Sequence, residues 1–407
     1  MHFGAGMGFC RSEKIQPHEA TVTEPRKPHF AYIECVRGYA ILLVIICHAT
    51  YLFPELPYPV HRVTVLGWHG VQLFFLASAV TLMMSWQYEK ARDGSVDVGA
   101  FFLRRFFRIA PAYYLASILY FVLQPPAGGF EPIQAAATYL FVNAWHPVLM
   151  GVTPDAWSVV PGSWSIGVEF TFYAALPILA STITSLSRAV YLFLATLLVG
   201  GTLNSLLWPS LEARIGAVPA TNFLYFWFPN QMCVFALGLC LFFLLQWERG
   251  RRSLLAAHPN LIAAFAVVMV ASTAFIVVPQ WLDPRVPLPP TFLLVSLALM
   301  IFILALARSR PGIFLNGPAA LLGRVSFSAY LLHAAVLKVL SDQPLLQNYF
   351  HTTGWLAIVA FALALVCIVA IILAGSWCTY RAIEAPMIDV GKALIRRRRL
   401  MVQRSMP

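Results

Sequence analysis

Ten long apolar stretches restrict this chain to one class of fold. Each is long enough, at about 1.5 Å per residue, to cross the roughly 30 Å hydrocarbon core of a bilayer as an α-helix. None shows the alternation of apolar and polar residues that marks the strands of an outer-membrane barrel. The stretches are residues 36–53, 64–86, 106–123, 164–183, 189–207, 223–246, 260–281, 291–307, 319–340 and 354–377. The sequence therefore predicts an all-α polytopic membrane protein, built as a single bundle of about ten transmembrane helices.

Composition agrees with this class and leaves little room for a soluble domain. The 407 residues are 59% hydrophobic and 11% charged, whereas a soluble domain has about 25% charged residues. We expect one membrane domain over residues 29–390. Residues 1–28 carry glutamates and prolines but no apolar core, which predicts a disordered cytoplasmic tail. Residues 391–407 are predicted to form a basic cytoplasmic tail.

Lysine and arginine alternate between rich and poor loops along the chain, and this pattern predicts the orientation. The segment before the first stretch, the loop around residues 90–105, the loop at 249–252, the loop with Arg308 and Arg310, and the tail are rich, while the other loops carry one basic residue or none. By the positive-inside rule, both termini are cytoplasmic. The rule also requires that residues 133–150 do not cross, so we expect a re-entrant or interfacial helix there on the outer side.

The same topology explains the net charge of +11 without a nucleic-acid partner. The basic run Arg396 to Arg399 is expected to contact anionic membrane lipid. The seven cysteines form no CxxC pair and lie mostly in apolar stretches, so we expect no disulfide framework and no metal site.

Arg37 and His48 are the first candidate site residues. Ten residues separate them, so at 3.6 residues per turn they share one helix face, about 16 Å apart along the axis. Ionisable side chains within the membrane usually face a cavity and are functional. The alternative is an arginine that only fixes topology and a histidine bonded to a neighbouring helix.

A cluster of basic residues begins the third apolar stretch. In FLRRFFRIAP, Arg105 and Arg108 are three apart and Arg104 and Arg108 are four apart, so the three share a face. Guanidinium groups at a cytoplasmic edge bind phosphorylated ligands through paired hydrogen bonds. They also serve simply as positive-inside anchors.

Polar residues recur every four positions in GSWSIGVEFTFY, where Ser165, Glu169 and Tyr173 form a stripe on an apolar helix. Counted from the ends of their stretches, Glu169 and His48 lie at a matching depth of roughly 8 Å below the outer face. A carboxylate beside an imidazole raises its basicity, which predicts that Glu169 orients His48 as a base. A protonated glutamic acid bonded within the bundle is the alternative.

A third polar face occurs in LGRVSFSAYLLHAAVL, where Ser326, Tyr330 and His333 line one side of the predicted helix. His333 falls near the middle of the membrane. It is either a second functional histidine or a packing histidine bonded to Tyr330 or to another helix. Ser165, Tyr173, Tyr330 and His333 are therefore possible accessory residues.

These segments, in this order, resemble the signatures of the bacterial acyltransferase-3 family of integral membrane O-acyltransferases. The segments are VRGYAILLVIICHA, GVQLFFLASAVTL, FLRRFFRIAPAYYL, GSWSIGVEFTFYAALPIL, LGRVSFSAYLLHAAVL and IEAP. The family's Arg–ten residues–His signature matches Arg37 and His48, its RxxR signature matches Arg105 and Arg108, and its glutamate matches Glu169. One departure is Gln72, where the family often has an aspartate, so we assign Gln72 no proton transfer.

The resemblance implies the reaction. The donor would be acyl-CoA, a co-substrate rather than a bound cofactor, held by Arg37, Arg105 and Arg108. The acceptor would be a hydroxyl of a cell-surface glycan or a related molecule, and the acyl group acetyl, with succinyl or longer chains open. His48 would act as general base with Glu169 as orienter, or would carry the acyl group itself. The enzyme would lie in the bacterial inner membrane as a multi-pass protein.

Two other functions fit parts of the sequence. A secondary transporter of a small polar or anionic solute also buries scattered polar groups, but no repeated pair of interrupted helices is visible. A membrane glycosyltransferase with a lipid-linked donor usually needs acidic metal ligands in an outer loop. The first outer loop, residues 54–63, offers only Glu55.

Overall fold

The computed structural model describes residues 31–126, 129–152, 157–276 and 290–404, and these contain helices and no strand. The all-α prediction is confirmed. The tail predicted for residues 1–28 lies outside the described residues. The helices of the bundle are α1 (Ala31–Thr50), α3 (Gly70–Asp93), α4 (Val98–Leu123), α7 (Ser163–Thr182), α8 (Leu186–Ile215), α10 (Phe228–Glu248), α12 (Pro259–Ser272), α13 (Pro290–Arg308), α15 (Ser326–Ser341), α17 (Gly354–Thr379) and α18 (Ala385–Arg404).

Shorter helices connect or extend these. They are α2 (Tyr58–Val65), α5 (Pro132–Tyr139), α6 (Pro147–Met150), α9 (Ala217–Phe226), α11 (Leu254–Ala257), α14 (Gly317–Arg324) and α16 (Pro344–Phe350). Within the described residues, seven helices are long and apolar enough to cross a membrane, and α14 with α15, bent by 82°, would make an eighth. Two further apolar helices, Pro259–Phe275 and Phe292–Arg308, are shorter. Over the described residues, each predicted stretch overlaps one α-helix or two consecutive α-helices, and the total of ten crossings stays a prediction.

Residues 133–150 do not form a spanning helix. They contain α5, a 3-10 turn at Asn143–Trp145 and α6, the longest of which has 8 residues. A helix of that length covers about 12 Å, less than half of the hydrocarbon thickness. The prediction that this segment does not cross is therefore confirmed. Its position on the outer side stays a prediction.

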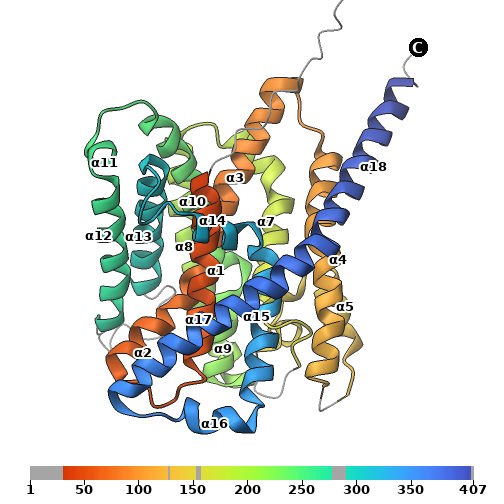
Figure 1. Ribbon diagram of the computed structural model, residues 1–407. Helices are drawn as coiled ribbons and strands as arrows, with labels where there is room; N and C mark the ends of the chain where they lie inside the picture. The colour runs from red at the N-terminus through yellow and green to blue at the C-terminus, as the bar shows by residue number, and fades with distance from the viewer. Residues whose placement is uncertain (1–30, 127–128, 153–156, 277–289, 405–407) are drawn as a thin grey trace, which may run out of the picture. The chain divides into compact units, whose positions relative to one another are not determined.

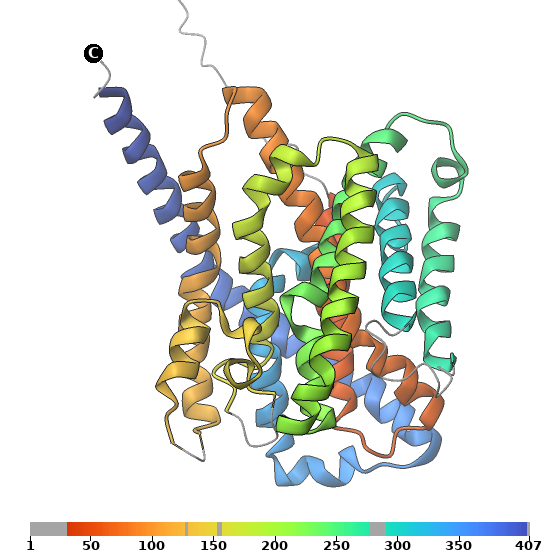
Figure 2. The ribbon, with the colours of Figure 1, turned by 180° about the vertical axis from the view of Figure 1, so that it is seen from behind.

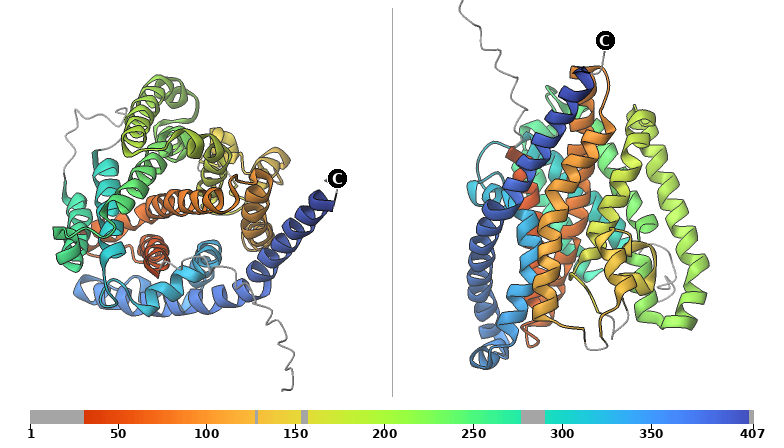
Figure 3. Two further views of the ribbon diagram at one scale, coloured as in Figure 1. Left: turned by 90° about the horizontal axis from the view of Figure 1, so that it is seen from above. Right: turned by 90° about the vertical axis from the view of Figure 1, so that its right-hand side faces the viewer.

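Helix α1 runs through the middle of the bundle. Seen from above, it lies between α3 on one side and α15 and α17 on the other (Figure 3). It meets α14 very closely, because a Cβ at Gly38 would overlap the carbonyl oxygen of Ala319, and one at Gly323 would overlap that of Glu34. Small residues allow such close backbone approach between membrane helices. This central place is what puts both Arg37 and His48 among other helices.

The far side of the bundle is formed by a second group of helices. Helices α8 and α10 lie side by side there, next to α7 (Figure 2). Helix α10 is almost entirely buried, because it also packs against α3, which in turn contacts α1. Helices α3 and α7, the second of which carries the stripe of Ser165, Glu169 and Tyr173, therefore pack against the apolar helix α10.

The C-terminal helices form one long rod across the front of the bundle. Helix α17 passes through a π-helical turn, Tyr380–Glu384 (η4), into α18, and α18 packs beside α4 (Figures 1 and 3). The segment predicted as a basic tail from residue 391 is thus helical as far as Arg404. The start of α1 and the end of α18 lie toward the same end of the bundle (Figure 1). That agrees with an even number of crossings, while their cytoplasmic location stays a prediction.

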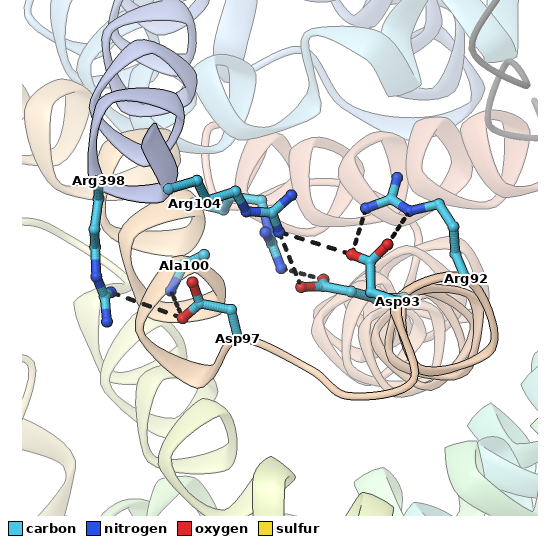
Figure 4. A network of polar contacts seen from close by, with 8 residues as sticks. Arg92, Asp93, Asp97, Ala100, Arg104 and Arg398 are labelled. Atoms are coloured by element: carbon cyan, nitrogen blue, oxygen red, sulfur yellow. Dashed lines mark hydrogen bonds and ion pairs between the residues drawn. The ribbon is translucent and has the colours of Figure 1, made fainter. Parts of the chain in front are cut away.

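Ion pairs tie α18 to the ends of α3 and α4 (Figure 4). Arg398 lies 3.7 Å from Asp97, and Arg399 lies 3.8 Å from Glu89. Asp97 also caps α4, since its Oδ1 accepts a hydrogen bond of 2.9 Å from the backbone N–H of Ala100. An exposed pair such as Arg398 with Asp97 contributes about 0–1 kcal/mol, so its main effect is to set the position of α18. Glu89, the partner of Arg399, is buried.

Candidate active site

A polar cavity lies beside α1, at the level of Arg37. Its volume is about 70 Å³, and four helices supply its polar lining: Arg37 from α1, Ser78 and Thr81 from α3, Ser165 and Glu169 from α7, and Ser326 and Tyr330 from α15. Four of these residues, Arg37, Ser165, Glu169 and Tyr330, are candidates from the sequence. The fold therefore brings together three segments that are far apart in the chain.

Glu169 is the carboxylate of this cavity. The Ser78 hydroxyl donates a hydrogen bond to Oε1 of Glu169. The carboxylate also interacts electrostatically with Arg37 and Arg105. The buried Tyr173 lies one turn further along α7 and is a further partner of Glu169. Glu169 thus offsets part of the positive charge that the arginines bring into the bundle.

The arginine cluster consists of Arg37, Arg105 and Arg108. Arg105 lies over the rings of Phe101 and Tyr173, at 5.7 and 5.9 Å from the ring centroids, which is cation–π distance. Both Arg37 and Arg105 interact electrostatically with Arg108. The predicted partner Arg104 does not join them.

Arg104 turns away from this cluster toward the end of α3. It forms an ion pair of 2.6 Å with Glu89. Adjacent residues on a helix point about 100° apart, so Arg104 and Arg105 face different neighbours: Arg104 faces Glu89, and Arg105 faces Tyr173. The cluster predicted from FLRRFFR is therefore wrong at this residue, and Arg37 of α1 is the third guanidinium.

His48 and His333 lie together at the other side of Tyr330. Their ring centroids are 5.0 Å apart. Nδ1 of His48 is 2.8 Å from the carbonyl oxygen of Val44, and Nδ1 of His333 is 2.5 Å from that of Tyr330. A carbonyl oxygen only accepts hydrogen bonds, so each Nδ1 carries the proton and each Nε2 keeps a lone pair. His48 is exposed, whereas His333 is 2% exposed.

Tyr330 connects the cavity with the histidine pair. Its hydroxyl bonds to Ser165 Oγ at 2.8 Å and donates to the carbonyl oxygen of Gly162 at 3.0 Å. Its ring centroid lies 5.4 Å from that of His333. Arg37, Tyr330, His333 and His48 thus form a continuous series of neighbours across the bundle.

The predicted pair of His48 and Glu169 is not formed. The structure joins Glu169 to Ser78 and places it beside Arg37, about three helical turns from His48 along α1. The depth estimate counted from the ends of apolar stretches and assumed that the outer ends of α1 and α7 lie at the same level. Helix α1 ends at Thr50, only two residues after His48, while α7 begins at Ser163, six residues before Glu169. The helix ends account for four residues of the difference in depth, about 6 Å, so the two ends also lie at different levels. His333 is instead the neighbour of His48.

Three polar residues escaped the sequence analysis. Ser78 and Thr81 line the cavity and are three apart in α3, a spacing that was visible in the sequence. Glu384 is buried, whereas Arg381, the nearest cation in the sequence, is exposed. Gln72, which stands where the family often has an aspartate, has a packing role, because its Nε2 donates a hydrogen bond to the Tyr225 hydroxyl at 2.9 Å.

Comparison with known proteins supplies the context for this geometry. A family model described as "Acyltransferase domain" matches residues 30–381. The chain is similar to a protein of Streptomyces mycarofaciens named acyltransferase MdmB, with 25% identity over 379 residues, which cover 86% of this chain and 90% of that protein. No solved structure matches.

Proposed function

This chain belongs to the acyltransferase family, and we propose that it moves an acyl group from acyl-CoA to a hydroxyl of a cell-surface glycan, with His48 as general base. Its identity as a membrane acyltransferase follows from the family match and the apolar helices. The donor, the acyl group, the acceptor and the role of His48 are the proposed part. Acetyl is the proposed acyl group, and the bacterial inner membrane is the proposed location.

The main support for this proposal is that His48 has a free Nε2 lone pair on an exposed ring. Its Nδ1 is occupied by the Val44 carbonyl, so Nε2 is the basic nitrogen, and the ring is exposed near the end of α1. A general base needs a free lone pair that a substrate proton can reach. The contact with His333 holds the ring from one side. A histidine that only filled the core would be buried, with both nitrogens bonded.

The proposed reaction is a direct transfer. The acceptor hydroxyl gives its proton to Nε2 of His48 while its oxygen attacks the carbonyl carbon of the thioester. The new C–O bond forms, and the C–S bond to CoA breaks. The CoA thiolate then takes the proton from the imidazolium, which leaves CoA thiol, an acyl ester and neutral His48. No electrons are exchanged with another reactant.

The donor would lie along the series from the arginines to His48. Arg37, Arg105 and Arg108 supply fixed positive charge for the phosphates of CoA, since guanidinium groups bind phosphate in a bidentate way. The cavity of about 70 Å³ that Arg37 lines lies at the arginine end of this series. Acetyl is proposed as the acyl group from the resemblance to the family. Glu169 would keep Arg37 in place through charge.

The test combines two assays on the same variants. Purified protein is given acetyl-CoA labelled in the acetyl group, and release of CoA thiol is followed with and without glycan acceptor. In parallel, surface glycans of a deletion strain carrying each variant are analysed for O-acetyl groups by NMR. His351→Ala is the matched control, because His351 is an exposed histidine that follows the short helix α16.

We expect wild type and His351→Ala to release CoA and to restore the O-acetyl signal. His48→Ala should lower the turnover by about a thousandfold, within the range that a general base contributes. Equal activity of His48→Ala at equal abundance in the membrane would refute the role of His48. An intact thioester in every sample, with transport of a solute instead, would refute the proposed acyl-CoA donor.

A further inference from the structure

Glu384 is a buried carboxylate that the proposed reaction does not yet use. It is only 3% exposed and lies at the end of the π-helical turn between α17 and α18. Burying an unpaired carboxylate is costly, so its surroundings must compensate. Single π-helical turns inside long helices occur frequently at functional sites.

The contacts of Glu384 lead to the arginine cluster. Its Oε2 accepts a hydrogen bond of 3.0 Å from the hydroxyl of the buried Ser328. Ser328 lies in α15 between Ser326 and Tyr330, which both line the polar cavity. The π-helical turn packs against α4, which carries Arg108. The carboxylate interacts electrostatically with Arg108 and with Arg37.

The sequence neighbour of Glu384 has a different partner. The guanidinium of Arg381 lies 5.0 Å from the ring centroid of Trp377, one turn back along the helix. Arg381 is exposed, whereas Glu384 is buried. The local ion pair that the RAIEAP sequence suggests is therefore not what holds this carboxylate.

We propose that Glu384 is a positioning residue for Arg37 and Arg108, which it holds ready for the phosphates of the donor. This rests on the proposed function, because those arginines are its proposed donor site. Arg37 and Arg108 repel each other, and they come from different helices. Glu169 lies near Arg37 on α7, and Glu384 interacts with Arg37 from the π-helical turn between α17 and α18. Two fixed carboxylates keep the guanidinium groups at a set spacing, which lowers the cost of ordering them when an anion binds.

The experiment measures donor binding and turnover separately. CoA is titrated into full-length protein in nanodiscs by calorimetry, and KM for acetyl-CoA and kcat are measured on the same samples. The variants are Glu384→Gln, Glu384→Asp and Ser328→Ala. The matched control is Asp389→Asn, because Asp389 is an exposed carboxylate on α18 that pairs with Lys392 at 2.8 Å. Thermal melting checks that each variant is folded.

We expect Glu384→Gln to raise Kd for CoA and KM for acetyl-CoA about tenfold, with kcat changed less than about threefold. Glu384→Asp should recover part of the affinity, Ser328→Ala should raise Kd about two- to threefold, and Asp389→Asn should behave as wild type. If Glu384→Gln does not fold, the Kd of Ser328→Ala for CoA decides the test.

The direction in which Kd for CoA changes distinguishes a positioning role of Glu384 from a role in which it only neutralises charge. If Glu384 only offsets positive charge, its removal makes the arginines attract the anionic donor more strongly, and Kd falls. Unchanged or tighter binding of CoA by folded Glu384→Gln, with wild type active, overturns the inference alone. A wild-type protein that neither binds CoA nor consumes acetyl-CoA overturns the proposed function, and the positioning role with it.

Discussion

The imidazole rings of His48 and His333 meet at 64°, with their centroids 5.0 Å apart, and each gives its Nδ1 to a carbonyl oxygen of its own helix. The two neutral rings therefore present two basic nitrogens side by side. Protonating both would place like charges next to each other in a poorly solvated site. The pair can thus take up one proton at a time, and His48, which is the exposed member, is the one that a substrate reaches.

His333 should support the orientation of His48. We expect His333→Ala to lower kcat about tenfold, because the ring of His48 would lose the neighbour that fixes it, while KM for the donor stays within about twofold. Steady-state kinetics on protein of equal thermal stability measures both values. An unchanged kcat would mean that His333 only fills space.

Substitutions of the adjacent residues Arg104 and Arg105 should affect KM for acyl-CoA differently. Arg105→Lys removes the planar group that lies over Phe101 and Tyr173, and we expect KM for acyl-CoA to rise about tenfold. Arg104→Lys, which keeps a cation opposite Glu89, should change KM less than about twofold. Comparing the two KM values is the measurement. If both substitutions have the same effect, the arginine cluster is not the donor site.

The hydroxyl of Tyr330 and that of Ser165 should be energetically coupled, because they are 2.8 Å apart and Ser165 can donate to Tyr330 while Tyr330 donates to the carbonyl oxygen of Gly162. We expect Tyr330→Phe to cost about 1 kcal/mol in the free energy of unfolding. In a double-mutant cycle with Ser165→Ala, measured by unfolding in SDS, the coupling should exceed about 0.5 kcal/mol. Strictly additive losses would show that the bond between them contributes nothing.

The crossing of α1 and α14 should tolerate no larger residue at Gly38. We expect Gly38→Val to lower the melting temperature strongly or to prevent folding, because even a Cβ overlaps the carbonyl oxygen of Ala319. Gly375→Ala is the control, since a Cβ there would meet Leu332 at an ordinary 3.6 Å. Melting curves of the two variants in the same detergent provide the comparison. Similar melting temperatures would mean that the helices can separate without loss.

A direct transfer predicts that no acyl-enzyme accumulates. Wild-type protein incubated with labelled acetyl-CoA and no acceptor should carry no acetyl group after rapid denaturation, because His48 takes only a proton. Mass spectrometry of the peptide that contains residues 38–50 measures this. An acetyl group on His48 would instead support the covalent alternative.

The sequence predicted the helices and the separate polar stripes well, because both depend on local periodicity. Arg37 and His48 share a face of α1, and Ser165 and Glu169 share a face of α7, as their spacing requires. Lateral neighbours were not predictable in this way. Periodicity does not say which helices touch, so the contact of His48 with His333, 285 residues later, could only come from the fold.

Two errors have a common physical origin. The depth of His48 was counted from the end of an apolar stretch, but helix ends depend on backbone capping and loop packing as well as on hydrophobicity. A pair of Glu384 with Arg381, the nearest opposite charge in the sequence, is the second wrong reading. A buried carboxylate needs fixed hydrogen-bond donors, and Ser328 on another helix provides one while Arg381 stays at the surface.

The π-helical turn at Tyr380–Glu384 also sets the rotational phase of the C-terminal rod. A π turn holds one residue more than the α-helical turn it replaces, and one residue corresponds to about 100° of rotation. Without that residue, the face of α18 that packs against Phe107 and pairs Arg398 with Asp97 would turn away from α4, or α17 would turn away from α15. The register of a surface helix and the direction of a buried carboxylate are thus fixed by the same extra residue, so deletions in this turn should be far more damaging than most substitutions there.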